Sequence, residues 1–340
     1  MRSALNLVLG TIAVFSILLA CLLGSTSLGI GQLFAALFSQ GAAGDNIVIW
    51  QIRLPRALAA FIVGAALGIS GAALQGLLRN PLAEPGVLGV SAFASLAATF
   101  VIYYGLAASA PWLVPLTAIA GALFATIIIA LAAIKTRSVV TLILIGVGLS
   151  SFAGAAMSLL LNLAPNPFTL ADLINWTLGS VANRSFDDIS LAAPFILAGG
   201  LILYLNRRGL TALTLGEEAA SGLGVNLKSL RIYVVLGAGL ATGAAVSLAG
   251  AIGFVGIVAP HIIRPFVRHD PARALIPSAL LAGIFLVLAD IGVRIVPTQT
   301  ELKLGVVAAI IGAPAFILIA MKQHDRGGHC LLYTSPSPRD

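Results

Sequence analysis

Charge is scarce in this chain of 340 residues: 9% of the residues are charged, whereas 59% are hydrophobic. Soluble domains carry roughly 25% charged residues, so the composition excludes an ordinary globular protein in water. A mean hydropathy of +1.06 indicates that lipid is the main solvent. The net charge of +7 is scattered between apolar runs and forms no basic stripe for nucleic acid. We therefore expect a membrane protein in contact with lipid and without a nucleic-acid partner.

The sequence also lacks a site that could capture energy. None of its four lysines follows a glycine, which excludes the Gly-rich phosphate-binding loop ending in Gly-Lys-Ser or Gly-Lys-Thr. Ion-coupled carriers keep acids, histidines or arginines inside the bilayer, and the apolar runs hold almost none. Asp290 and Arg294 are the exception, and their four-residue spacing would let them pair along one helix face. A proton site there is the alternative, but we expect the energy source to lie outside the chain.

Cysteine and histidine are too few and too dispersed for a metal site or a disulfide framework. Cys21 and Cys330 lie at opposite ends of the chain. The histidines do not have the spacing of metal ligands. The serines, histidines and acids likewise give no pattern that predicts a catalytic triad. We therefore predict no catalytic residues, no metal and no cofactor. The histidines are His261, His269, His324 and His329.

Long apolar runs recur along most of the chain. A helix needs about 20 apolar residues to cross the roughly 30 Å hydrocarbon core. The run at 250–267 is the least regular, because Gly250, Gly253 and Gly256 precede Pro260 and could equally mark a broken or re-entrant segment. The prediction is an all-α polytopic protein with ten spans, or nine if that run does not cross. The ten runs are 4–24, 57–78, 87–105, 112–134, 139–163, 189–206, 229–249, 250–267, 274–294 and 304–321.

Basic residues give an independent test of the ten-span topology, because Lys and Arg concentrate in cytoplasmic loops. With the amino terminus inside, 14 of the 19 Lys and Arg fall inside and 5 outside. Nine spans would break this pattern after Pro260. We therefore predict a multi-pass protein of the inner (plasma) membrane with both termini cytoplasmic. The five outer residues are Arg53, Arg56, Arg184, Arg294 and Lys303.

The two ends of the chain differ from the rest. The first run contains Leu18-Leu19-Ala20-Cys21 near its end, similar to a lipoprotein signal and its lipidated cysteine. A cleaved signal would leave an odd number of spans and weaken the charge asymmetry, so a retained first helix is the simpler interpretation. Residues 325–340 change abruptly to a polar, proline-containing composition, and we expect an unstructured tail after a single transmembrane domain at 1–322.

Small residues recur at helix-contact spacing, as in Gly64 and Gly68 or Gly239 and Gly243. The fifth run carries many of them on one side. Tight helix packing is the simplest explanation, and the alternative is that this side lines a translocation path at a dimer axis. The residues that we assign to such a path are Gly146, Ser150, Ser151 and Gly154.

Several motifs in fixed order resemble one family of transport proteins. Arg53-Leu54-Pro55-Arg56 is followed by Gln75 and by 79–91, which reads RNPLAEPGVLGVS. Further matches are Trp176 to Ser180, Leu215 to Val225, Gly250 to Arg264, Ala289 to Arg294, and Gly312 to Phe316. Together they resemble the FecCD-type permeases of ABC importers for iron siderophores, haem and vitamin B12, over roughly residues 1–322. Segment 50–91 is most similar to the vitamin B12 branch.

This resemblance implies a type II ABC importer permease of ten spans per subunit. It implies a homodimer that works with a cytoplasmic ABC ATPase dimer and with a periplasmic or lipid-anchored substrate-binding protein. The cytoplasmic segment 207–228 would couple to the ATPase, and the matching outer arginines, Arg53, Arg56 and Arg294, would dock the binding protein. The coupling residues implied are Gly216, Glu217, Glu218, Ala219, Ala220, Ser221, Gly222, Leu223 and Gly224.

Local chemistry agrees with a helix in the coupling segment, since Glu217 and Glu218 would lie in its first turn and glycine near its end. The substrate is less defined. Val139 and Val140 stand where the vitamin B12 permease carries small hydroxyl residues, and Lys303 replaces a usual proline. Iron chelates, haem and cobalamin all remain open, and an ion-coupled secondary transporter or channel is the alternative function.

Overall fold

A computed structural model gives the fold and describes residues 2–24, 28–38, 40–136, 138–296 and 302–328. Within these ranges the chain is helical and contains no strand, which confirms the predicted all-α class. Seven helices are long and apolar enough to cross a membrane, and three shorter apolar helices accompany them. Each of the ten predicted runs contains one of these helices.

The long helices follow the predicted runs closely, and each starts or ends within a few residues of its run. They are α1 (Arg2–Leu22), α4 (Leu54–Leu78), α7 (Leu113–Lys135), α8 (Val139–Asn162), α10 (Phe186–Leu205), α13 (Leu227–Ala249) and α15 (Pro271–Ile295). The shorter apolar helices are α5 (Val90–Tyr103), α14 (Val255–Ile263) with the 3-10 turn η2 (Arg264–Val267), and α16 (Leu304–Gly328).

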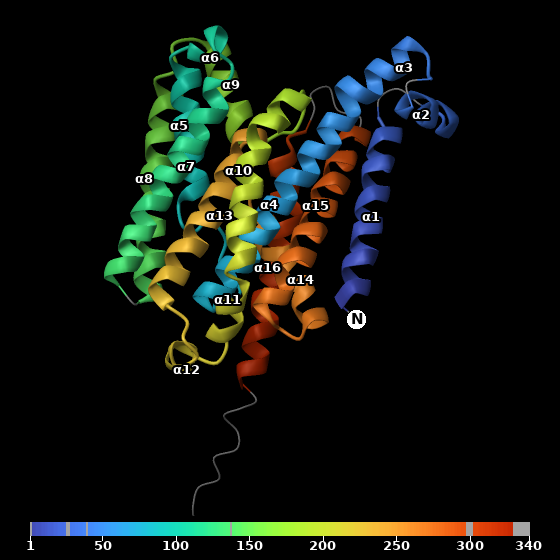
Figure 1. The fold of residues 1–340 in the computed structure, drawn as a ribbon. Helices are drawn as coiled ribbons and strands as arrows, with labels where there is room; N and C mark the ends of the chain where they lie inside the picture. Colours follow the sequence, from blue (N-terminus) through green and yellow to red (C-terminus); the bar gives the residue numbers. More distant parts are fainter. Residues whose placement is uncertain (1, 25–27, 39, 137, 297–301, 329–340) are drawn as a thin grey trace, which may run out of the picture.

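Short helices cap the two ends of the bundle (Figure 1). One end carries α2 (Ile30–Leu37), α3 (Ala43–Ile47), α6 (Leu106–Ser109) and α9 (Pro167–Thr177), and a π-helical turn η1 (Val48–Arg53) leads from α3 into α4. The other end carries the amino terminus, α11 (Arg207–Leu213) and α12 (Glu217–Gly222). These are called the α9 end and the α12 end below.

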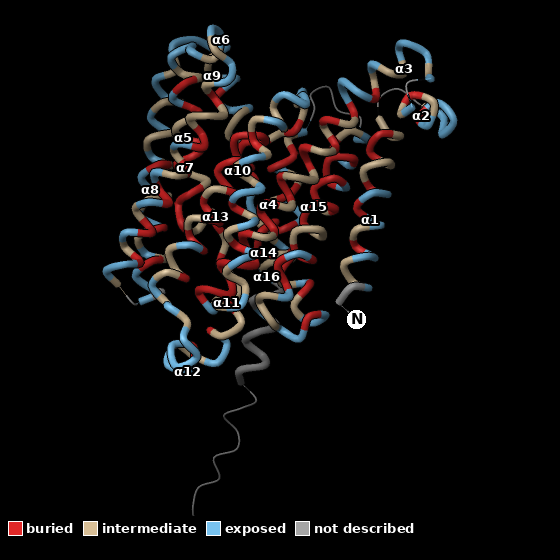
Figure 2. Tube along the Cα trace, viewed as in Figure 1, coloured by how far each residue is buried: buried red, intermediate tan, exposed pale blue. Residues whose placement is uncertain are grey.

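The core lies around α4, α13 and α15, and the outer helices are mostly exposed (Figure 2). Of the apolar window in α13, 78% is buried, compared with 17% in α8. Glycines bring the central helices together: a Cβ at Gly64 would collide with the carbonyl of Ala282, and one at Gly239 would collide with Thr126. The prediction of close contacts at these small residues is confirmed. The exposed faces of α8 and α10 are where lipid or another subunit can pack.

Two of the crossings are interrupted. Residues 79–89 form turns and coil between α4 and α5, and residues 250–254 form an extended break before α14. The run at 250–267 is therefore helical only from Val255 onward, so the expected continuous helix is wrong and the alternative of a broken segment is confirmed. Irregular backbone is tolerated inside a membrane protein where other helices enclose it. Here α4 does so, since a Cβ at Gly71 would collide with the carbonyl of Gly256.

The carboxyl-terminal boundary also needs correction. Helix α16 continues to Gly328, so 325–328 are helical, whereas the abrupt change in composition had predicted an unstructured tail from 325. The expected tail beyond that point, at 329–340, lies outside the described residues.

Candidate functional site

The segment between α10 and α13 forms the two short helices α11 and α12. Gly216 begins α12 with φ of +100° and ψ of 160°, a conformation that is essentially restricted to glycine. Glu217 and Glu218 occupy the first turn, where carboxylates complement the helix dipole. Gly224 follows the helix with φ of +83° and donates its N–H to the carbonyl of Ser221. The predicted helix in the coupling segment is confirmed, with glycine in the left-handed region on both sides of it.

Helix α12 is held to the bundle by one side and exposes the other. Ala220 is fully buried in the core cluster, and Arg231 Nη2 of α13 donates to Glu217 Oε1 at 2.7 Å. Nothing lies within 4 Å of the position that a Cβ at Gly222 would occupy. The exposed side therefore combines an acid, small residues and one large apolar side chain. It consists of Glu218, Ala219, Ser221, Gly222, Leu223 and Gly224.

Helix α11 links this exposed helix to the central helices. Thr211 Oγ1 donates to Asp270 Oδ1 at 2.7 Å, and the same carboxylate oxygen caps α15 by accepting the N–H of Ala272. On the side of α13, the position of a Cβ at Gly209 lies 2.7 Å from Leu230 Cδ1, so α11 packs tightly there. A displacement of α11 and α12 would therefore change the contacts with α13 and α15 directly.

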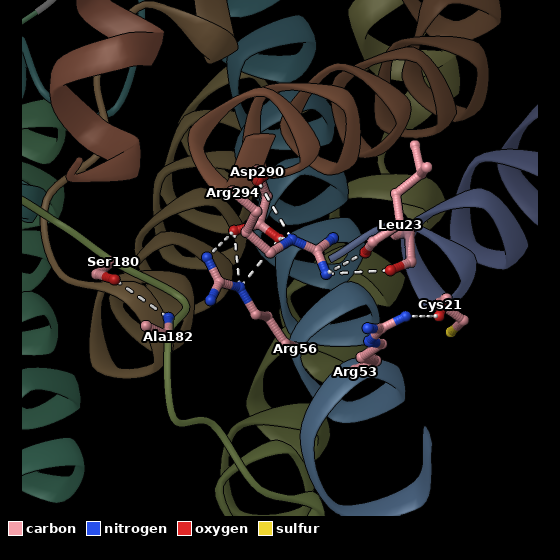
Figure 3. Close-up of polar contacts among 9 residues, drawn as sticks. Cys21, Leu23, Arg53, Arg56, Ser180, Ala182, Asp290 and Arg294 are labelled. Atoms are coloured by element: carbon pink, nitrogen blue, oxygen red, sulfur yellow. Dashed lines mark hydrogen bonds and ion pairs between the residues drawn. The ribbon is translucent and has the colours of Figure 1, made fainter. Parts of the chain in front are cut away.

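At the α9 end, Asp290 gathers two arginines from different helices (Figure 3). Arg56 donates from Nη2 to Asp290 Oδ1 at 2.8 Å and from Nε to both carboxylate oxygens. Arg294 Nε lies 3.2 Å from Asp290 Oδ2, which confirms the predicted pair along α15. Asp290 is 1% exposed, and the arginine side chains are 13% and 10% exposed. Sequence spacing gave no sign of Arg56, because it is 234 positions from Asp290.

The same arginine cluster holds the end of α1. Arg53 Nη1 donates to the carbonyls of Cys21 and Leu22 at 2.9 and 2.8 Å, and Arg294 Nη1 donates to Ala20 and Leu23. The last carbonyls of a helix lack intrahelical partners, and a cation there also complements the helix dipole. The three predicted docking arginines thus join α1, α4 and α15 inside the chain. Their contact with a binding protein stays a prediction.

The predicted path residues of α8 divide into two pairs. Ser150 Oγ donates to the carbonyl of Gly86 at 3.2 Å, and a Cβ at Gly146 would collide with the carbonyl of Val87. These two residues pack against the irregular segment 79–89. Ser151 is exposed, and Gly154 has open space around its Cβ position. A path along α8 would therefore be bordered by both the helix and the irregular segment.

The comparisons with known proteins agree with this arrangement. The family model of the FecCD transport family matches residues 12–322. The chain belongs to the FecCD transport family. It is 40% identical over 329 residues to the ABC transporter permease protein YvrB of Bacillus subtilis, covering 93% of this chain and 92% of the relative. It is 36% identical over 299 residues to the vitamin B12 import system permease protein BtuC of Vibrio cholerae, covering 87% and 89%.

A solved structure is also similar to this FecCD chain. It is described as an inward-facing conformation of a metal-chelate type ABC transporter, and it matches with a TM-score of 0.85 and 28% sequence identity. The match covers 94% of this chain and 99% of the other. The chain is thus a permease of the ABC transporter class with membrane-spanning helices, as the sequence motifs implied.

One acidic residue of this FecCD chain, Glu84, is partly buried where the sequence predicted only a loop. Glu84 lies in the irregular segment 79–89 and lines two cavities, of about 330 and 110 Å³, which it shares with residues of the break at 250–254. A Cβ at Gly256 would lie 3.6 Å from Glu84 Cβ, so the two interruptions meet at this side chain. Hydropathy placed Glu84 in a loop, and only the fold shows that the loop folds back into the bundle. Among the described residues, no group of three or more His, Cys, Asp or Glu could hold a metal ion.

Proposed function

We propose that this chain is the permease subunit of an ATP-driven importer that moves an iron chelate or vitamin B12 across the inner membrane. The exposed side of α12 carries this proposal, because its small residues and open Gly222 leave a surface that another protein can approach closely. The relatives' names, which mention vitamin B12 and metal chelates, support the substrate class.

The ATPase dimer would bind at the α12 end, which would face the cytoplasm. Most lysines and arginines of the sequence fall on this side of the predicted topology, as cytoplasmic loops require. ATP binding would bring the two ATPase subunits together and press on α12. The hydrogen bond from Thr211 to Asp270 and the packing of Gly209 on Leu230 would transmit the movement to α15 and α13. The chain itself would perform no chemistry.

The binding protein would dock at the α9 end, beside Arg53, Arg56 and Arg294. Arg53 and Arg294 bind the carbonyls that end α1, and Arg56 binds Asp290 beside them, so this cluster of three arginines and one acid is locally positive (Figure 3). Arg294 Nη2 is buried and finds no acceptor in the described part of the chain, so an acidic group could use this donor only once the contacts to α1 give way. Docking would compete with the contacts to α1, which gives the binding protein a means of moving that helix.

The path would run at the axis of a homodimer, between the α8 faces of the two copies. The poor burial of α8 supports this, and so do the small residues Gly146, Ser150, Ser151 and Gly154. The two irregular segments that meet at Glu84 lie beside this face, since Ser150 contacts Gly86. Interrupted helices are where transporters commonly place substrate contacts and moving parts.

A photo-crosslinking amino acid at Gly222 tests the coupling surface in living cells. Because the Cβ position of Gly222 is open, the insertion leaves the fold intact, and we expect a crosslink to a protein that contains a phosphate-binding Gly-Lys-Ser or Gly-Lys-Thr loop. The matched control is Gly10 in α1, whose Cβ position is equally open. Mass spectrometry identifies the partner, and the control should capture no such ATPase.

Uptake measurements then distinguish an importer from a secondary carrier. The uptake of radiolabelled cyanocobalamin or of a ferric siderophore is measured in cells that contain the ATPase identified by crosslinking. The measurement is repeated in cells from which the gene of that ATPase is deleted. We expect Gly222→Trp to reduce uptake by at least tenfold while the protein level stays normal, and deletion of the ATPase to abolish it. Uptake that persists without any ATPase would establish the ion-coupled alternative.

A further inference from the structure

The largest cavity described at the α12 end, about 740 Å³, is separate from the exposed side of α12. It lies between the first turns of α1, the end of α10 with α11, and the turn from η2 into α15. Both charged and apolar side chains form its walls. They are Leu5, Asn6, Tyr204, Arg207, Arg208, Thr211, Phe266, Val267, Arg268, Asp270, Ala272, Arg273, Ile276 and Pro277.

Arginine dominates the charge of this cavity. Four arginines line it and Asp270 is its one acid, so the lining carries a net positive charge. Asp270 is already engaged, with Arg273 Nε at 2.8 Å and with Thr211 and the backbone of α15. Arg207 stacks on the ring of Tyr204, with 3.8 Å from its Cζ to the ring centroid. The positive charge that is available to an anion therefore belongs mainly to Arg208 and Arg268.

Arg208 and Arg268 are both exposed, and neither has an ion-pair partner among the described residues. They come from different elements, α11 and the turn after η2, and they line the same cavity. Arg268 adopts a left-handed conformation with φ of +57°, held by its N–H to the carbonyl of Pro265. Two arginines from separate elements thus line one cavity, and no carboxylate of the described residues neutralises them.

Apart from Asn6, Tyr204 and Thr211, the rest of the wall is apolar, and parts of it are exposed at the end of the bundle. Leu5 comes from α1, of whose apolar window only 28% is buried, and Ile276 of α15 is 39% exposed. Phe266, in η2, is 66% exposed. A cavity at the end of membrane helices, with a basic floor and apolar sides, matches a ligand with an anionic head and hydrocarbon chains.

We propose that this cavity binds an anionic phospholipid, with the phosphate between Arg208 and Arg268 and the acyl chains along Leu5 and Ile276. Free inorganic phosphate would use the arginines but leave the apolar walls uncovered. An acidic surface of a partner protein would likewise leave them exposed to water. The lipid would join α1, α11 and α15 at the end of the bundle where α12 is held.

Lipid binding by the purified full-length chain tests the proposal. The chain is delipidated in detergent, titrated with phosphatidylglycerol or phosphatidylcholine, and the bound lipid is counted by native mass spectrometry. We expect one phosphatidylglycerol per chain, bound at least tenfold more tightly than phosphatidylcholine. Arg208→Gln with Arg268→Asn should weaken the binding of phosphatidylglycerol by roughly 10- to 30-fold, since each basic residue contributes about 1 kcal/mol and their effects on the dissociation constant multiply. Asparagine is chosen at 268 because it tolerates positive φ.

The matched control removes the same charge from the same end. Lys135, the last residue of α7, and Lys228, in the first turn of α13, are both exposed and outside the cavity. Lys135→Gln with Lys228→Gln should change the affinity by less than threefold, and Arg208→Lys alone should retain most of the binding. An equal loss in the control would show nonspecific attraction and overturn the proposal.

Two further outcomes would also overturn it. Inorganic phosphate at millimolar concentration is also tested as a competitor. If it displaces bound lipid as effectively as added phosphatidylglycerol does, the site recognises an anion without lipid specificity. If the cavity variant binds phosphatidylglycerol normally but loses the ATPase identified by crosslinking at Gly222, the arginines belong to the protein interface. Circular dichroism and size exclusion of each variant verify that the helices remain folded.

Discussion

The α12 helix and the arginine cluster around Asp290 are charged regions at opposite ends of the bundle, and their side chains are used in opposite ways. Glu218 and Gly222 are exposed, with open space around the Cβ position of Gly222. Asp290 is 1% exposed and is enclosed by Arg56 and Arg294. Polar groups that are exposed and unengaged are available to a partner, whereas buried charges that satisfy each other hold helices together. Changes at the first region should therefore affect transport, and changes at the second should affect folding.

The largest effect is expected from Asp290→Asn, which keeps the shape of the side chain and removes its charge. Two arginines would be left buried without their carboxylate, and removing one partner of a buried pair costs about 3 to 5 kcal/mol. The variant should unfold at lower SDS fraction in mixed micelles, and α1 should become sensitive to protease first, because Arg294 also holds its last carbonyls.

Asp187→Asn is the control, because Asp187 is an exposed residue in the first turn of α10. Its unfolding should shift by less than about 0.5 kcal/mol. If Asp290→Asn instead unfolds like the parent chain but binds the substrate-binding protein more weakly, the cluster is mainly a docking surface and the contrast between the two regions fails.

The sequence could predict those parts of the fold that depend on contact with lipid. Hydropathy located all ten apolar helices, because the demand for about 20 apolar residues is set by the bilayer and needs no knowledge of neighbours. Gly250, Gly253 and Gly256 raised a broken segment as an alternative at 250–267, but hydropathy could not choose between the two, since glycine and alanine are equally apolar in a helix and in an enclosed coil. Hydropathy likewise could not show that Glu84 is partly enclosed, because that depends on segment 79–89 packing against α8 and α14.

The candidate site divides in the same way. Local signals predicted α12 and the pairing of Asp290 with Arg294, which are four residues apart. The contacts of Arg53 with Cys21 and Leu22 span 31 or 32 positions, and that of Arg56 with Asp290 spans 234. No periodicity encodes such distances, so the internal role of these arginines became visible only in the fold.

An intermediate effect is expected at the start of α12, and it tests whether that helix is preorganised. Gly216→Ala should cost roughly 1 to 3 kcal/mol locally, because φ of +100° is nearly inaccessible to a residue with a Cβ. Gly222→Ala is the matched control and should be neutral or stabilise the helix by up to about 1 kcal/mol. Amide hydrogen exchange in α12 measures both. Equal protection in the two variants would mean that the backbone at Gly216 is not confined as described.

The smallest effect is expected from Glu217→Gln, which separates the anchored side of α12 from its exposed side. Glutamine keeps an acceptor for Arg231 Nη2 but loses the charge, and Glu217 is 33% exposed, so solvent screens much of the attraction. We expect a loss of about 0.5 kcal/mol, seen as roughly twofold faster exchange of the Ala220 amide. Glu218→Gln is the matched control, because it removes the same charge from the same turn without touching Arg231. Equal exchange in both variants would show that the helix dipole, and not the ion pair, holds this turn, and the anchoring of α12 would then come from packing around the buried Ala220 rather than from Arg231.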